Sequence, residues 1–206
     1  MTFNVPSVTL GGQRGHDDDA IDIFVTITPP SDTSTRLFGG YITLTPSDGG
    51  TTLRVPYAGY HGDYQAIVAL APTPFAFPWL AKLVGTNLVN QPNGAAFTLV
   101  DDDVPFILLH LDHQVRTLKM EVINVVTGVT AGFADIEDFL PRNSMPTSFF
   151  AFAWDGTTVR RAGGQLKAVP NGSYRIDLTG LKALGDPANP AHIEHWLSPT
   201  VVISRP

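Results

Sequence analysis

Residues 40–45 read Gly-Tyr-Ile-Thr-Leu-Thr, and residues 51–57 read Thr-Thr-Leu-Arg-Val-Pro-Tyr. Apolar and polar residues alternate in the first run, which is typical of a β-strand with one buried face. The sequence between them, Pro-Ser-Asp-Gly-Gly, combines residues that favour tight turns. The two runs and the turn together predict a β-hairpin.

Similar short runs recur on both sides of this hairpin, separated by segments rich in Gly and Pro. The predicted strands are residues 21–28, 40–45, 51–57, 96–100, 106–110, 117–126, 149–153, 158–160, 173–178 and 200–204. Residues 79–84 allow at most one helical turn, because they follow Pro78 and end at Gly85.

These strands predict an all-β fold of two β-sandwich modules. The acidic run Asp101-Asp102-Asp103, followed by Val104-Pro105, has the composition of a solvated linker. We therefore expect residues 1–103 to form the first module and residues 104–206 the second.

Composition excludes several classes of protein. The chain is 43% hydrophobic and 16% charged, which is too apolar for a disordered chain. Its net charge of −6 and its lack of a basic cluster argue against nucleic-acid binding, and no apolar run is long enough for a membrane span. Cysteine is absent, so disulfides and thiolate chemistry are excluded. No glycine-rich phosphate loop follows a strand and precedes a helix, and no cofactor is expected.

The hairpin belongs to a longer signature that ends at Gly62-Asp63-Tyr64. Its matching residues are Phe38-Gly39-Gly40-Tyr41-Ile42-Thr43-Leu44, Leu53-Arg54-Val55-Pro56-Tyr57, Gly59-Tyr60 and Gly62-Asp63-Tyr64. The signature resembles the fibronectin-type-III-like domain that follows the catalytic domain in large secreted subtilisin-like serine proteases, including cell-envelope and fungal enzymes. The residues themselves favour a structural role: Pro56 suits a strand edge, and Gly59 and Gly62 permit a tight fold-back.

The second half carries a further resemblance. Its matching residues are Phe152-Ala153-Trp154-Asp155-Gly156, Val169-Pro170-Asn171-Gly172-Ser173-Tyr174-Arg175, residues 183–190 and Trp196-Leu197-Ser198-Pro199. This half resembles the immunoglobulin-like module that ends many fungal and bacterial subtilases. The resemblance implies that Trp154 fills the sandwich core, with turns at Asp155-Gly156 and Asn171-Gly172. It also implies a secreted chain that is a non-catalytic, carboxy-terminal accessory region of a parent protease.

Members of that family have additional strands before the point that corresponds to Met1. We therefore expect the first module to begin partway through its sandwich and to leave an edge strand exposed. Because an exposed edge can pair with another chain, a homodimer through this edge is one expected assembly.

Fragments that resemble a subtilisin-type triad occur in the family's order. They are Asp32-Thr33-Ser34, His61-Gly62-Asp63 and Ser144-Met145-Pro146. Each departs from the family motif at a residue that the motif requires, and the α/β scaffold that assembles a triad is missing. The sequence therefore predicts no catalytic residues.

One histidine–aspartate pair, one histidine pair and two acidic runs are the candidate metal ligands of the sequence. The histidine candidates are His110 with Asp112, and His192 with His195; the acidic runs are residues 17–19 and 101–103. Neither run has the spacing of a known calcium loop, so we expect solvated carboxylates and no metal site. Asn171-Gly172-Ser173 is a sequon that makes Asn171 a candidate for glycosylation.

Two functions remain open from the sequence. The first is the accessory region, with the parent's protease domain or another protein surface as its partner. The alternative is a free-standing β-sandwich that binds carbohydrate or mediates adhesion. In that case a glycan would stack on exposed aromatic residues among Tyr57, Tyr60, Tyr64, Trp79 and Trp196.

Overall fold

The computed structural model describes residues 1–9, 21–29, 31 and 33–206. These residues form β-strands and short 3₁₀ turns, and no α-helix occurs among them. The predicted all-β class is confirmed. The chain divides into two compact units, Met1–Tyr64 and Gln65–Pro206.

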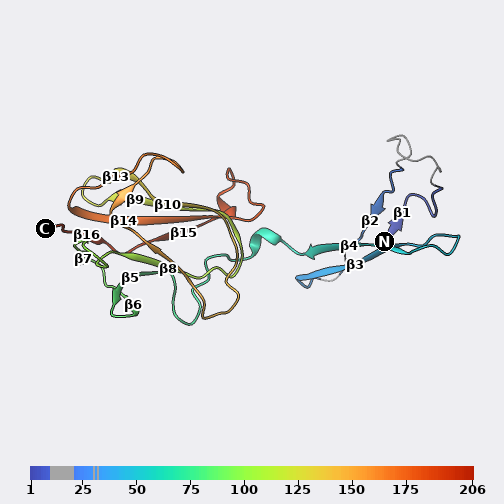
Figure 1. Cartoon of the computed structure of the whole chain (residues 1–206), viewed down its shortest axis with the longest axis horizontal. Coiled ribbons are helices and arrows are strands. Elements are labelled where there is room, and N and C mark those ends of the chain that lie inside the picture. The colour runs from blue at the N-terminus through green and yellow to red at the C-terminus, as the bar shows by residue number, and fades with distance from the viewer. Residues whose placement is uncertain (10–20, 30, 32) are drawn as a thin grey trace. The chain divides into compact units, whose positions relative to one another are not determined.

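The first unit contains two antiparallel, two-stranded sheets (Figure 1). β1 (Thr2–Phe3) pairs with β2 (Val25–Thr26). The strand predicted over residues 21–28 is therefore present, but only as the two residues of β2. β3 (Arg36–Leu44) pairs with β4 (Leu53–His61), which confirms the predicted hairpin and lengthens both of its strands. None of the described residues of this unit is buried, so its sheets enclose no core of their own.

The hairpin signature is explained by aromatic rings that lie over glycines on the opposite strand. Tyr57 is the register partner of Gly40, and Phe38 is the partner of Gly59. A Cβ atom added at Gly40 would lie 3.1 Å from Cε1 of Tyr57, and one at Gly59 would lie 2.5 Å from Cζ of Phe38. Only glycine leaves room for each ring, and the ring in turn covers backbone that glycine leaves bare.

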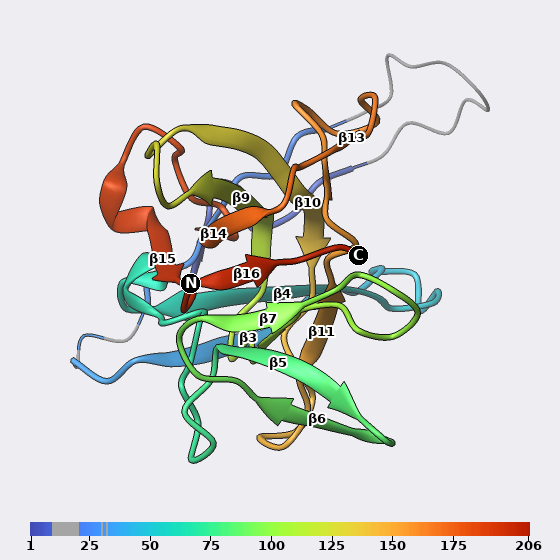
Figure 2. The same cartoon turned by 90° about the vertical axis from the view of Figure 1, so that its left-hand side faces the viewer.

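The second unit is a β-sandwich of two sheets (Figure 1 and Figure 2). The larger sheet has the order β10-β9-β14-β16-β7, and β15 also pairs with β14. Its strands are β7 (Ala95–Phe97), β9 (Val115–Asn124), β10 (Thr130–Leu140), β14 (Gly172–Lys182), β15 (Ile193–Leu197) and β16 (Val201–Ile203).

The smaller sheet has the order β11-β8-β5-β6. Its strands are β5 (Trp79–Val84), β6 (Asn87–Asn90), β8 (Phe106–Leu109) and β11 (Phe150–Ala153). Two shorter strands, β12 (Thr157–Thr158) and β13 (Lys167–Ala168), pair with each other. The 3₁₀ turns η2 (Tyr64–Ala66) and η3 (Pro190–His192) complete the described elements.

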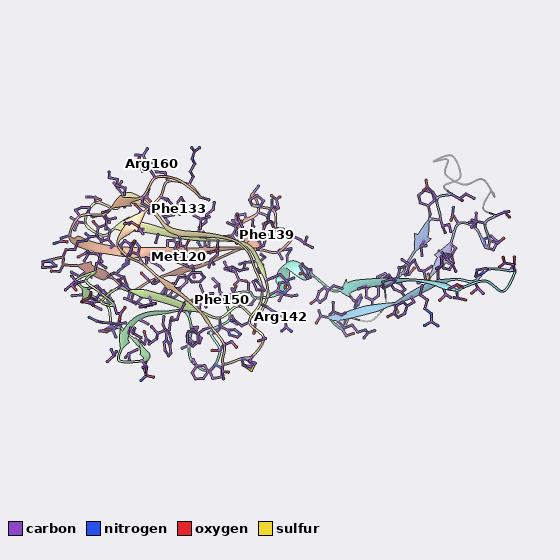
Figure 3. The ribbon with its side chains drawn as sticks, in the orientation of Figure 1. Met120, Phe133, Phe139, Arg142, Phe150 and Arg160 are labelled. Carbon is purple, nitrogen blue, oxygen red and sulfur yellow. The ribbon has the colours of Figure 1, made fainter. Side chains whose placement is uncertain are left out.

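The core of this unit lies between the two sheets and draws buried side chains from both. Its members include Leu80, Ile107 and Leu109 from the smaller sheet and Leu118, Met120, Val122, Ile176 and Leu178 from the larger. Met120 is labelled in Figure 3. Trp154 is 2% exposed and meets Tyr174 edge-on at 5.9 Å, in the core position predicted for it.

The division between the units differs from the predicted boundary after Asp103. β7 runs parallel to β16 in the larger sheet, and β5 pairs with β8 in the smaller one. Residues assigned to the first module therefore supply three strands of the second unit's sandwich, β5, β6 and β7. The break instead follows Tyr64, the last residue of the signature and three residues beyond the end of β4.

The acidic run that suggested a linker is a turn fixed by hydrogen bonds. Oδ2 of Asp103 accepts from the backbone nitrogen of Thr98 at 3.1 Å and from its hydroxyl at 2.7 Å. Nζ of Lys82 lies 2.6 Å from the other carboxylate oxygen. Burial raises the pKa of Asp103, but the bonds from Lys82 and Thr98 outweigh it and hold the pKa below its ordinary value.

β10 was not predicted, and it forms one edge of the larger sheet. Two register shifts interrupt its pairing with β9, so the two-residue alternation is broken. The carboxy-terminal half of β10 carries three acidic residues, Asp135, Glu137 and Asp138. Burial and the two neighbouring carboxylates raise the pKa of Glu137. Charges on an edge strand oppose pairing with a further strand.

Candidate functional site

Two of the five aromatic candidates, Trp79 and Trp196, line a single open groove in the second unit. The groove has a volume of about 480 Å³. Trp79 begins β5 and Trp196 lies in β15. The sandwich therefore brings together two indole rings that are far apart in the sequence.

Trp79 is held in place by neighbouring aromatic residues. Its Nε1 donates a hydrogen bond to the carbonyl of Phe75 at 2.8 Å. Its ring centroid lies 4.9 Å from that of Phe77, which is buried and also packs against Phe149 at 5.6 Å. Because Trp79 remains only half-buried, it is both fixed and accessible from the groove.

Amide and guanidinium groups border the two indoles, from Asn90, Gln91, Asn93 and Arg175. Oδ1 of Asn93 accepts from the backbone of Thr200 at 2.8 Å, and Nε2 of Gln91 donates to a neighbouring carbonyl at 2.9 Å. Within the described part of the chain, Nδ2 of Asn93 and Oε1 of Gln91 take part in no hydrogen bond. These atoms can bond a ligand without giving up a protein partner.

Indole faces beside planar amides suit a sugar ring. The C–H face of a hexose can lie against an indole, while its hydroxyls exchange hydrogen bonds with amide groups. A volume of about 480 Å³ lies within the usual range of about 300–1,000 Å³ for ligand sites.

The other three aromatic candidates belong to the first unit. Tyr57, Tyr60 and Tyr64 are all half-buried. Tyr60 and Tyr64 meet edge-on with their ring centroids 5.6 Å apart, and the ring of Tyr57 lies over Gly40. Packing within and beside the hairpin accounts for all three, so the structure assigns the candidate groove to the tryptophans alone.

The triad-like fragments have other partners where the structure describes them. Nδ1 of His61 lies 2.6 Å from the carbonyl oxygen of Ser34. A carbonyl can only accept, so Nδ1 donates to the backbone, whereas a triad histidine donates this proton to a carboxylate. Asp32 lies outside the described residues, and Ser144 lies in the second unit, between β10 and β11.

His110 and Asp112 do lie together, as the sequence suggested. Nε2 of His110 is 3.0 Å from Oδ1 of Asp112, and its Nδ1 donates to the carbonyl of Ser148 at 2.6 Å. Both ring nitrogens of this buried histidine are therefore engaged within the protein. The pair anchors the loop before β11 to the end of β8.

The second histidine pair is divided between two local structures. Nδ1 of His192 accepts from the backbone of Asp186 at 2.9 Å, whereas Nδ1 of His195 lies 3.7 Å from Asp177. In the described residues, no three His, Cys, Asp or Glu side chains gather as a metal site would require. The acidic run of residues 17–19 lies outside the described residues.

The glycosylation candidate Asn171 is exposed beside the start of β14. Its amide donates to the carbonyl of Arg205 at 3.0 Å and accepts from the backbone nitrogen of the same residue at 3.0 Å. Asn171 therefore fastens the carboxy-terminal segment to the sandwich.

Sequence reasoning missed the polar residues that border the tryptophans. Residues 90–93, which begin with the last residue of β6, read Asn-Gln-Pro-Asn, a pattern that predicts a turn but not a groove. Their significance depends on β15, which was not predicted as a strand. No protein-family model matches the chain, and no curated protein sequence matches it. Among the described residues, no helix has the length and apolar character needed to cross a membrane.

Proposed function

We propose that this chain is the non-catalytic, carboxy-terminal accessory region of a secreted subtilisin-like serine endopeptidase. In this role it stabilises or orients the protease domain of its parent, or mediates contacts with another protein surface. The single observation that supports the proposal most strongly is the β3–β4 hairpin, which carries all of the subtilase-like signature except its last three residues and leaves apolar side chains exposed.

The two most exposed apolar residues of the hairpin share one of its faces. Leu37 and Tyr41 are four residues apart on β3, so their side chains point to the same side. Leu37 is 78% exposed and Tyr41 is 65% exposed. A two-stranded hairpin is at best marginally stable in water by itself. A protease domain that covers this face would stabilise the hairpin and would itself be held in a defined orientation.

Two measurements test this proposal. The first is the coding sequence upstream of Met1, where we expect an in-frame subtilisin-like catalytic domain with intact Asp, His and Ser motifs. The second is the half-life of the complete protease at elevated temperature, which we expect Tyr41→Asp to shorten. Its kcat/KM before heating should not change, because the hairpin takes no part in the chemistry.

Val126→Asp is the matched control, because Val126 is also an exposed apolar residue but lies in the second unit, where it is 85% exposed. A native transcript that begins at Met1 without a protease would contradict the proposal. Equal half-lives for Tyr41→Asp and Val126→Asp would also contradict the proposed role of the hairpin. A dimeric mass in light scattering that Tyr41→Asp converts to a monomeric mass would assign this face to a second copy of the chain.

A second candidate function, a free-standing β-sandwich that binds carbohydrate, is supported by the groove of Trp79 and Trp196. On this hypothesis, a glycan array should yield neutral oligosaccharides that quench tryptophan fluorescence in solution. Trp196→Ala and Asn90→Ala should each weaken that binding by about tenfold, the loss of one good contact of about 1.4 kcal/mol. Asn90 is exposed and makes no side-chain hydrogen bond with the described residues, so its replacement should leave the fold intact.

Phe139→Ala provides the control for this experiment, since Phe139 is an exposed aromatic residue outside the groove. An array without hits would exclude this candidate. Equal weakening by Phe139→Ala and Trp196→Ala would exclude the groove as the binding site.

A further inference from the structure

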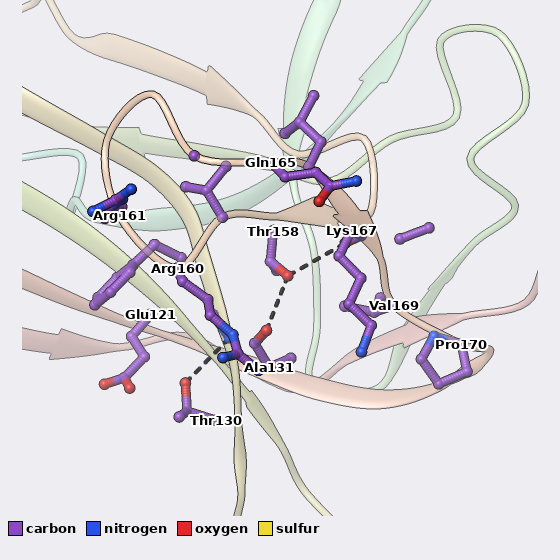
Figure 4. Close-up of a pocket in the computed structure, with 16 residues that line it drawn as sticks. Glu121, Thr130, Ala131, Thr158, Arg160, Arg161, Gln165, Lys167, Val169 and Pro170 are labelled. Atoms are coloured by element: carbon purple, nitrogen blue, oxygen red, sulfur yellow. Dashed lines mark hydrogen bonds between the residues drawn. The ribbon is translucent and has the colours of Figure 1, made fainter.

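A second and larger groove in the sandwich unit carries an excess of cationic side chains (Figure 4). Its volume is about 1070 Å³. One side is the beginning of β10, and the other is the β12–β13 hairpin with the loop between its strands. Arg160, Arg161 and Lys167 line the groove, and Glu121 is the one carboxylate among its lining residues.

The floor of this groove is the outer face of the larger sheet. Glu121 on β9 and Phe133 on β10 are register partners, so their side chains lie on the same face. Met120 and Val122, which flank Glu121, point into the core. Successive residues of a strand alternate between faces, so Glu121 and Phe133 lie on the side away from the core. Nζ of Lys119 approaches the Phe133 ring to 5.9 Å and adds a further cation beside the groove.

The wall that carries the cations is tied to the sheet. Phe133 and Val159 exchange two backbone hydrogen bonds of 2.8 and 2.9 Å. The buried hydroxyl of Thr158 donates to the carbonyl of Ala131 at 3.0 Å and lies 3.3 Å from the carbonyl of Lys167 (Figure 4). Arg160 and Lys167 therefore project from a hairpin whose position is fixed on both sides of the loop.

The three cations are available to a ligand. None of the ion pairs formed by the described residues includes Arg160, Arg161 or Lys167. The chain has only 13 Lys and Arg residues and a net charge of −6, so three of them around one groove make a local exception to its overall charge. Clustered cations in a concave site attract an anionic ligand and raise its rate of association.

The size and the apolar lining indicate what kind of anion fits. Ligand sites for small molecules reach about 1,000 Å³, so this groove has room for a polymer segment. Its apolar residues include Val159, Leu166 and Pro170, and Leu166 is strongly exposed. Gln165 is its one side-chain amide, and the single aromatic ring, Phe133, already faces Lys119. An acidic polysaccharide would find few amides or open ring faces here, whereas a peptide would find contacts for both its carboxylates and its apolar side chains.

We propose that this groove binds an extended acidic segment of polypeptide that also carries apolar side chains. Arg160 and Arg161 pair with its carboxylates through guanidinium groups that match the planar geometry of a carboxylate, and the ammonium group of Lys167 adds a further positive charge. Leu166 and Val159 contact its apolar residues. The inference goes beyond the accessory role and does not depend on it, since the groove lies wholly within the sandwich unit.

The test uses the complete chain and a fluorescent peptide of alternating Asp and Leu, with binding followed by fluorescence anisotropy at low salt. The double variant Arg160→Glu/Lys167→Glu should weaken binding about tenfold or more, because it replaces two attractive charges with repulsive ones. Leu166→Ser should also weaken binding, although it changes no charge. Both variants alter exposed residues, so their melting temperatures should match that of the unmodified protein.

Arg116→Glu/Arg142→Glu is the matched control, because it changes the net charge of the same unit by the same amount. Both arginines are exposed and line neither groove, and Figure 3 shows Arg142 well away from Arg160. Unchanged binding in this control supports the proposal, and an equal loss would overturn it by showing a general effect of charge. Equal binding of a peptide with Asn in place of Asp would also overturn it. So would a heparin-derived oligosaccharide that binds at the groove when the acidic peptide does not.

Discussion

Glu194→Gln is expected to lower the free energy of unfolding of the sandwich unit by about 3 kcal/mol, because it breaks a buried ion pair. Glu194 lies 3.1 Å from Nζ of Lys182, whose side chain is almost fully buried. Its two carboxylate oxygens also accept from the backbone nitrogens of Ala69 and Leu70, at 2.8 and 2.7 Å. A Gln side chain has one acceptor oxygen in place of two and leaves the Lys182 ammonium without its counter-charge. Urea unfolding followed by tryptophan fluorescence measures the loss.

This ion pair fastens the beginning of the sandwich unit to the larger sheet. Nζ of Lys182 also donates to the carbonyl of Gln65 at 2.7 Å, and Nε2 of Gln65 donates to the carbonyl of Ala183 at 2.8 Å. Burial and the nearby cations Lys182 and Arg142 lower the pKa of His113, which favours its neutral form. Glu194 therefore interacts with Lys182, with two backbone nitrogens and with His113, so removal of its carboxylate affects several groups together.

Two further variants distinguish the contribution of this buried ion pair to stability from the effect of removing any one carboxylate. Asp177→Asn removes the carboxylate of a more exposed pair, 3.7 Å from His195, and should cost less than about 1 kcal/mol. The double variant Lys182→Met/Glu194→Gln should be more stable than Glu194→Gln alone, because it leaves no buried charge unpaired and keeps the same amide acceptor for the backbone nitrogens of Ala69 and Leu70. A cost for Glu194→Gln no greater than that for Asp177→Asn would contradict the prediction.

Trp154→Ala is expected to cost about 3–5 kcal/mol, the usual range for truncation of a large buried aromatic residue. The indole packs edge-on against Tyr174, and its Nε1 donates to the carbonyl of Thr157 at 2.7 Å. Truncation leaves a cavity in the core and removes the partner of a part-buried carbonyl. Because the substitution removes a fluorophore, unfolding is followed by circular dichroism.

Trp154→Phe should cost less than Trp154→Ala, because it fills most of the cavity and loses the hydrogen bond to Thr157. Val126→Ala, at a strongly exposed position, should change stability by no more than about 0.5 kcal/mol. If Trp154→Ala proved no more destabilising than Val126→Ala, Trp154 would not be a core residue.

Local patterns predicted elements whose partners are near in sequence. The β3–β4 hairpin is such an element, because its alternation, its turn and its glycines opposite Phe38 and Tyr57 all lie within one short segment. The strands at β8, β9, β11 and β14 were also located, since their apolar runs supply the core.

Two kinds of strand escaped prediction. β5 consists of Trp-Leu-Ala-Lys-Leu-Val, a sequence that is also compatible with a helical turn. It becomes a strand because β8 and β6 pair with its two edges. β10 pairs with β9 and β15 pairs with β14, and neither has a clean alternation of apolar and polar residues; register shifts in β10 disrupt its pattern further. Their conformation depends on hydrogen bonds from strands that fold elsewhere in the chain.

The candidate sites likewise combine features that local sequence predicts with features that depend on distant strand pairing. Residue patterns alone were sufficient to predict the all-β class and the signature hairpin, and to include Trp79 and Trp196 among five candidate aromatic residues, because each of these depends on residue type and near neighbours. The folded structure was needed to show that those two tryptophans share a groove, that Asp103 closes a turn, and that Arg160 and Lys167 line a groove beside β10. These features depend on sheet pairing, which joins segments far apart in the chain, and no local pattern of residues specifies which strand edges will meet.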